Sequence, residues 1–134
     1  MFFAGLLALL PSAALPASWK HGQSRGLDVY EAKTDGGAMR LVCDPDRVFG
    51  STPNTSLIVE MPKEKDPKRI VFLARNGQQA HFVPVNGIVL MNDQKPEEWR
   101  KMLDMIKKGG EFAVVTANDS MTFELEPIGS LRCE

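Results

Sequence analysis

Residues 69–91 read RIVFLARNGQQAHFVPVNGIVLM, three largely apolar runs separated by the pairs Asn76-Gly77 and Asn86-Gly87. Asn-Gly favours a tight two-residue hairpin, because both positions tolerate the positive φ angles that such a turn requires. We therefore expect strands at residues 69–74, 80–85 and 88–91, following one another as a meander. The first run is apolar after its arginine, which predicts a central strand buried on both faces.

Turn signals recur at short intervals along the rest of the chain, as is typical of an antiparallel all-β domain. Asp35-Gly36 predicts a hairpin between two early strands, and period-two spacing places Cys43 on the core side of the second. The sequence predicts a mainly β fold, an antiparallel β-sandwich or a partly open barrel. The further strands are expected at residues 27–32, 39–43, 56–61, 111–117 and 121–126.

One α-helix is expected to interrupt this pattern and to pack on the sheet. Pro96 suits the first turn of a helix, and Gly109-Gly110 supplies a stop signal. An apolar stripe with helical spacing runs between them and predicts the packed face. A role of the same stripe in binding a partner or cofactor is the alternative. The stripe consists of Trp99, Met102, Leu103 and Ile106.

The N-terminal residues 2–10 read FFAGLLALL, which is too short for a bilayer span of about 20 residues. Small residues and prolines follow, so the sequence predicts a secretory signal peptide at residues 1–17, cleaved after Ala14 or Ala17. Residues 18–134 then form a single β-rich domain, periplasmic or secreted, with no stable membrane span after signal cleavage. A buried N-terminal helix or a permanent anchor is the alternative, since no Lys or Arg precedes the apolar stretch.

Cys43 and Cys133 are the two cysteines of the chain. An even count in an exported protein predicts a disulfide between them. Two unpaired buried thiols are the alternative. A redox-active pair is disfavoured, because catalytic cysteines usually lie close together in the sequence.

Charge and histidine content argue against several function classes. Sixteen Lys and Arg balance seventeen Asp and Glu, for a net charge of −1, so nucleic acid is not expected as a partner. His21 lies in a Gly- and Ser-containing stretch expected to be mobile, and His81 lies in an expected strand. No serine is surrounded by a nucleophile motif, and the histidine spacing is uninformative for a metal. We therefore expect no enzyme, no catalytic residue, no cofactor and no metal site.

Several short segments carry a resemblance to a known group of proteins. The sequence resembles the invasion-associated locus B-like proteins and, more loosely, small periplasmic accessory proteins associated with type VI secretion. The resemblance implies a β-sandwich module of the bacterial envelope without a catalytic role. The segments are Trp19, Val85-Asn86-Gly87-Ile88-Val89-Leu90, Gly109-Gly110, Phe123-Glu124-Leu125, Gly129-Ser130-Leu131 and Cys133.

The function that the sequence favours is a non-catalytic envelope module that binds another envelope protein or an envelope polymer. An exposed apolar patch or an unpaired sheet edge is expected to mark the contact surface. An inhibitor of a hydrolase such as a lysozyme is a narrower form of this hypothesis. A hydrolase using His81 would need a serine or an acid within hydrogen-bond reach. A carrier of a small apolar ligand would need an internal cavity lined by Trp99, Met102, Phe72 and Phe82.

Overall fold

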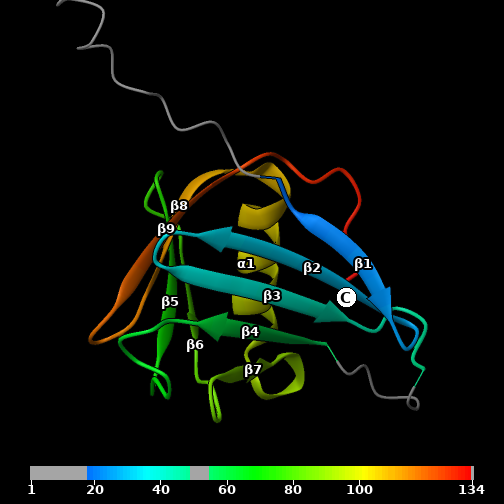
Figure 1. Cartoon of the computed structure of the whole chain (residues 1–134), viewed down its shortest axis with the longest axis horizontal. Helices are drawn as coiled ribbons and strands as arrows, with labels where there is room; N and C mark the ends of the chain where they lie inside the picture. The colour runs from blue at the N-terminus through cyan, green and yellow to red at the C-terminus, as the bar shows by residue number, and fades with distance from the viewer. Residues whose placement is uncertain (1–17, 49–54, 134) are drawn as a thin grey trace, which may run out of the picture.

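The computed structural model describes residues 18–48 and 55–133, and the expected signal peptide at residues 1–17 lies outside the described residues. The described strands form two antiparallel sheets that face each other, with an α-helix beside them (Figure 1). This arrangement confirms the prediction of a mainly β sandwich with one packed helix.

The five-stranded sheet has the order β1-β2-β3-β4-β7 and the four-stranded sheet the order β6-β5-β8-β9. All neighbouring strands in both sheets run antiparallel. The first sheet comprises β1 (Lys20–Ser24), β2 (Leu27–Thr34), β3 (Gly37–Cys43), β4 (Ser56–Glu60) and β7 (Ile88–Leu90). The second comprises β5 (Ile70–Ala74), β6 (Gln79–Phe82), β8 (Gly110–Val115) and β9 (Ser120–Leu125).

Alternating side chains from both sheets fill the interior of the sandwich. Met121, Phe123 and Leu125 of β9 are buried, as period two predicts, because successive strand residues point to opposite faces. Phe112 stacks on Phe123 at 5.6 Å between ring centroids and on Phe72 at 5.8 Å. The inner face of the four-stranded sheet is thus a row of packed aromatic rings, which contribute a large share of the buried apolar surface.

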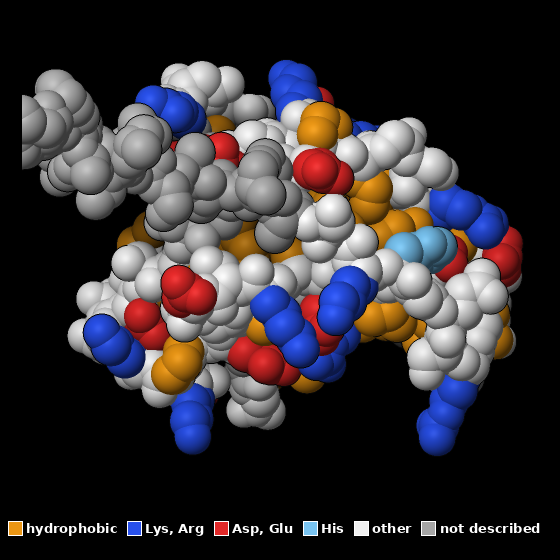
Figure 2. All heavy atoms as spheres, turned by 45° about the horizontal axis from the view of Figure 1, so that its top comes forward, with side chains coloured by type: hydrophobic (Ala, Val, Ile, Leu, Met, Phe, Trp, Pro, Cys, Tyr) orange, Lys and Arg blue, Asp and Glu red, His pale blue; other side chains and the backbone are white. Residues whose placement is uncertain are grey.

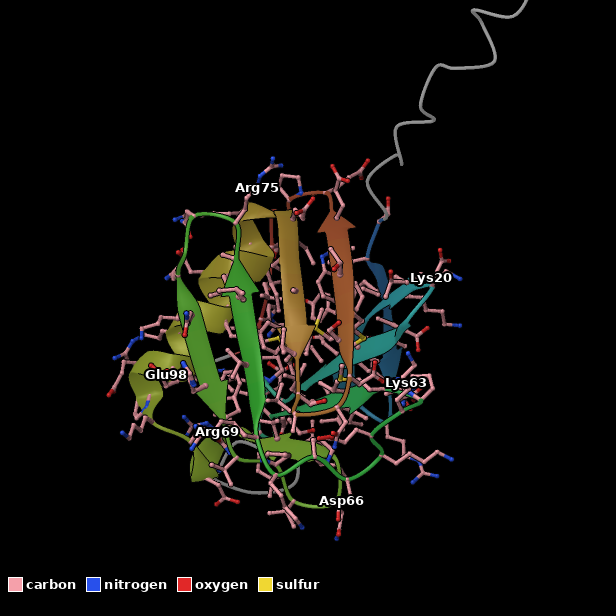
Figure 3. The ribbon with its side chains drawn as sticks, turned by 90° about the vertical axis from the view of Figure 1, so that its left-hand side faces the viewer. Lys20, Lys63, Asp66, Arg69, Arg75 and Glu98 are labelled. Carbon is pink, nitrogen blue, oxygen red and sulfur yellow. A yellow bond between two sulfur atoms is a disulfide. The ribbon has the colours of Figure 1, made fainter. Side chains whose placement is uncertain are left out.

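Helix α1 (Pro96–Lys108) follows a short 3-10 turn, Met91–Asp93, and closes one side of the sandwich. It lies behind the five-stranded sheet in Figure 1 and alongside β6 in Figure 3. The predicted stripe is buried, and Met105 is buried with it. Trp99 contacts Phe82 edge to face, at 6.0 Å between ring centroids. The stripe is therefore a packing face, as predicted.

One feature of the first half of the chain differs from expectation. The segment around His21, expected to be mobile, is strand β1, which pairs with β2. All five residues of β1 are exposed, so no apolar alternation marked it as a strand. The turn at Arg25-Gly26, which joins β1 to β2, was the one local clue to this hairpin.

Both Asn-Gly turns expected in the meander at residues 69–91 are present, but the third run does not stay in the same sheet. Asn76-Gly77 joins β5 to β6 within one sheet, but β7 leaves that sheet and pairs with β4. Strand β6 ends at Phe82, before Pro84, whose missing N–H disfavours continued pairing. Strand β5 is central, as predicted, yet Leu73 on its outer face is 38% exposed. The apolar run therefore does not mean burial on both faces.

Candidate binding surface

The connection between the two sheets carries a cluster of exposed apolar side chains. Val83 and Val85 are 62% and 57% exposed, and Ile88 and Leu90 of β7 are 37% and 43% exposed. A tight turn at Asn86-Gly87 folds Val85 against Ile88, with backbone hydrogen bonds of 2.8 and 3.0 Å in the two directions. The positive φ angles of Asn86 (52°) and Gly87 (78°) allow this turn. We call the side chains of Val83, Val85, Ile88 and Leu90 the β7 surface.

Pairing with β4 extends the β7 surface over the outer face of the five-stranded sheet. Ile88 lies opposite Ile58, and the exposed Leu90 lies opposite Ser56. Beside them is a hollow of about 490 Å³, lined mostly by apolar groups. The residues that line it include Ala38, Ile58, Met61, Pro62, Lys65 and Ile88.

Polar groups border this hollow on one side. Glu60 accepts a hydrogen bond from Arg40 Nη2 at 3.2 Å, so its charge is already paired. Lys65 makes no ion pair or side-chain hydrogen bond with any residue that the structure describes. An apolar floor with a charged rim is the usual composition of a protein contact surface.

A second, polar cleft of about 580 Å³ lies between β6 and the start of α1. Lys101 Nζ lies 2.8 Å from Glu98 Oε2, and this contact lowers the pKa of Glu98 below its usual range, against the opposing effect of partial burial. The backbone N–H of His81 donates to Glu98 Oε1 at 3.0 Å and lowers the pKa of Glu98 further. Glu98 is therefore occupied with holding the edge of β6, and Figure 3 shows it on the same side as Arg69.

The structure places the two histidines in different settings. His81 Nε2 contacts Gln79 Oε1 at 3.0 Å, and among the described residues no serine hydroxyl forms a hydrogen bond with its ring. His21 stacks on Tyr30 at 4.4 Å, and its Nε2 lies 3.1 Å from Asp28 Oδ1. Sequence reasoning missed this second contact, because nothing in the sequence marks Asp28 as inward-facing.

Asp28 is a buried carboxylate on β2 with three polar neighbours. Gln23 Nε2 donates to its Oδ1 at 3.3 Å, and Arg132 Nη1 lies 3.9 Å from its Oδ2. Arg132 also binds the exposed Asp46 at 2.9 Å. Asp28 thus joins β1, β2 and the C-terminal tail.

The predicted disulfide between Cys43 and Cys133 is present, with 4.8 Å between the Cα atoms. It attaches the C-terminal tail to β3, which lies next to β2. Trp99 Nε1 donates to the carbonyl oxygen of Cys133 at 3.3 Å, so α1 is joined to the same point. The Asp28 contacts hold the β1 edge of the five-stranded sheet to the tail, the disulfide holds the central strand β3 to it, and the β7 surface lies at the opposite edge.

The residues proposed to line a ligand cavity pack on one another instead. Phe72 contacts Phe82 edge to face at 5.8 Å, and Phe82 contacts Trp99. Phe72 and Met102 are fully buried in the core cluster. These side chains fill the interior between the sheets and α1.

Two other classes of site are absent from the described residues. Among residues 18–48 and 55–133, no group of three or more His, Cys, Asp or Glu is placed to hold a metal ion. None of the described helices has the length and apolar character needed to cross a bilayer. Comparison with protein-family models, curated proteins and solved structures gives no match.

Proposed function

We propose that this protein is a non-catalytic, exported binding module of the cell envelope that contacts another envelope protein through the β7 surface. The observation that carries the proposal is the clustering of four exposed apolar side chains within eight successive residues, 83–90. Contiguous apolar surface exposed to water is unfavourable, and on soluble proteins it commonly marks a contact site.

The neighbouring hollow gives this surface a shape that a partner can enter. An apolar side chain of the partner would lie over Ile58 and Ile88, with Lys65 at the rim. Such central apolar anchors with a polar rim supply most of the affinity of protein interfaces. Basic and acidic side chains are intermixed on the face shown in Figure 2, which fits a protein partner better than a polyanion.

The disulfide supports the compartment in this proposal. Disulfides persist in oxidising compartments such as the bacterial periplasm and the exterior. The sequence resemblance to small periplasmic proteins points to the same compartment. Inhibition of an envelope hydrolase is a narrower form of the same proposal, in which the partner is that hydrolase.

A carrier of a small ligand is less well supported by the same geometry. Ligand sites bury most of the ligand surface inside a cleft. The 490 Å³ hollow lies on the outer side of the five-stranded sheet, where a bound molecule keeps one side in water. A partner protein would cover that side.

The test is capture of envelope proteins by the disulfide-bonded protein, with Ile88→Asp as the disrupting variant and Leu73→Asp as its matched control. Both wild-type side chains are strand residues of similar exposure, 37% and 38%, on different sheets. We expect Ile88→Asp to lose at least about tenfold in partner affinity and Leu73→Asp to retain it, because only Ile88 lies in the β7 surface. Equal capture by both variants, or no capture by folded wild-type protein, would contradict the proposal.

A further inference from the structure

Three of the four sheet edges are wholly or partly covered by other parts of the chain. At β6, the N–H of His81 donates to Glu98, and Gln94 forms hydrogen bonds of 3.0 and 2.9 Å with the N–H and carbonyl of Val83. These side chains occupy the backbone groups that a further strand would need. Side chains of Gln94 and of α1 therefore block the outer edge of the four-stranded sheet.

The edges at β9 and β7 are closed in other ways. Thr34 Oγ1 donates to the carbonyl oxygen of Thr122 at 2.8 Å, which places the β2–β3 hairpin against β9. Strand β7 has only three residues, and the Val85–Ile88 turn folds back along its free side. At β9 the N–H of Ser120 also donates to Asp119 Oδ1 at 2.8 Å, so part of the row of backbone groups at each of these two edges is occupied.

The remaining edge, β1, is open. Arg25 (φ 53°) and Gly26 (φ 82°) form a two-residue turn, and in such hairpins the flanking residues, here Ser24 and Leu27, exchange both backbone hydrogen bonds. Bonded and non-bonded positions alternate along an antiparallel pair, so the N–H and C=O groups of His21 and Gln23 point away from β2. No backbone hydrogen bond to these outward groups is found within the described residues.

We propose that two copies of this chain pair through β1, antiparallel and centred on Gly22, so that the two five-stranded sheets become continuous. In this register His21 lies opposite Gln23 of the second copy, and Gln23 lies opposite its His21. All outward backbone groups of both strands then find partners. A register shifted by one residue toward the N-terminus places His21 opposite His21, and a shift the other way places His21 opposite the turn residue Arg25.

The side chains of β1 are compatible with this register. Lys20 lies opposite Ser24 of the second copy, so no two like charges face each other directly, which would be destabilising. Gly22 lies on the two-fold axis, where it leaves space between the strands. The side chains of His21 and Gln23 are already held by Asp28, so β1 is ordered before pairing and less conformational entropy is lost.

This pairing does not depend on the proposed partner contact. Strand β1 and the β7 surface occupy opposite edges of the five-stranded sheet. A dimer joined through β1 would therefore present two β7 surfaces, one at each end of the continuous sheet.

Cysteine substitution in β1 measures the register directly. Gly22→Cys places two thiols on residues directly opposite in a non-hydrogen-bonded pair, where Cα atoms lie about 4.5 Å apart, within disulfide range. Ser24→Cys is the matched control on the same face, because the two residues 24 would lie about 14 Å apart. The added Cβ at Gly22 meets no atom within 4 Å, so the variant is expected to fold.

We expect mild oxidation of the purified full domain to give a covalent dimer with Gly22→Cys and none with Ser24→Cys, as seen by non-reducing electrophoresis and intact mass. A mixture of Lys20→Cys and Ser24→Cys should form the mixed dimer, since these residues face each other. Light scattering of the wild-type protein should give the mass of a dimer that dissociates on dilution. A monomer at all concentrations, or equal cross-linking of residues 22 and 24, would overturn the proposal. Capture of an extended partner segment by monomeric protein would also overturn it.

Discussion

The two edges of the five-stranded sheet differ in what holds them and in what they expose. The β1 edge is attached to the tail by the Asp28 contacts, and β3 is attached to the same tail by the Cys43–Cys133 disulfide. The β7 edge has three residues, exposes Ile88 and Leu90, and borders an apolar hollow. Polar contacts therefore hold the β1 edge and the disulfide holds the central strand β3, whereas the β7 edge keeps apolar side chains in water.

The largest expected effect is loss of the disulfide. Replacing both cysteines, Cys43→Ser with Cys133→Ser, should lower the free energy of unfolding by about 4 to 5 kcal/mol, the chain-entropy estimate for a loop of 90 residues. Urea unfolding of both forms gives the measurement. Equal urea midpoints for the two forms would show that the disulfide does not stabilise the five-stranded sheet, and would contradict this side of the comparison.

The next effect concerns the buried carboxylate. Asp28→Asn should lower the free energy of unfolding by about 1–3 kcal/mol. The substitution removes the buried negative charge that contacts His21 and Arg132. Asp46→Asn is the matched control, since Asp46 also binds Arg132 but its side chain is 65% exposed. That change should be within about 0.5 kcal/mol. Thermal and urea unfolding of both variants would sharpen the comparison, and equal losses would contradict it.

The smallest effect is a change in pH dependence at the β6 edge. The lowered pKa of Glu98 means that its ionised form stabilises the fold above the ordinary carboxyl pKa, and that this stability is lost as the pH falls through the lowered value. The wild-type protein should therefore lose stability below about pH 4 more steeply than Glu98→Gln. Glu97→Gln, an exposed neighbour on the same helix turn, should follow the wild-type curve. The same change of stability with pH in all three proteins would show that Glu98 does not hold β6.

Most of the fold could be predicted because its signals are local. Alternation at Met121, Phe123 and Leu125 identified the buried face of β9, and helical spacing at Trp99, Met102 and Ile106 identified the packed face of α1. The pairing of Cys43 with Cys133 followed from an even count in a chain expected to be exported. The first two inferences depend only on residues close together in the sequence, and two cysteines allow only one intramolecular pairing.

Less of the candidate site could be predicted, because its parts come together only in the fold. The turn at Asn86-Gly87 was expected, but a turn does not determine which sheet its flanking residues join. Val83 and Val85 are exposed because the chain leaves the four-stranded sheet after β6, and Pro84 was the one local clue to this. Strand β1 has no apolar face, so its pairing with β2 was not visible in the residue pattern.

The β-rich class and the helix with its buried stripe could be inferred from the residue pattern, because propensity and periodicity act over a few residues, and the disulfide partners followed from the cysteine count. Only the tertiary structure decided that β7 joins β4, that Asp28 is buried among β1, β2 and the tail, and that Gln94 and Glu98 cover β6 while β1 stays open. These outcomes depend on contacts between segments distant in the chain. Burial and edge pairing are properties of such contacts, and no single segment contains them.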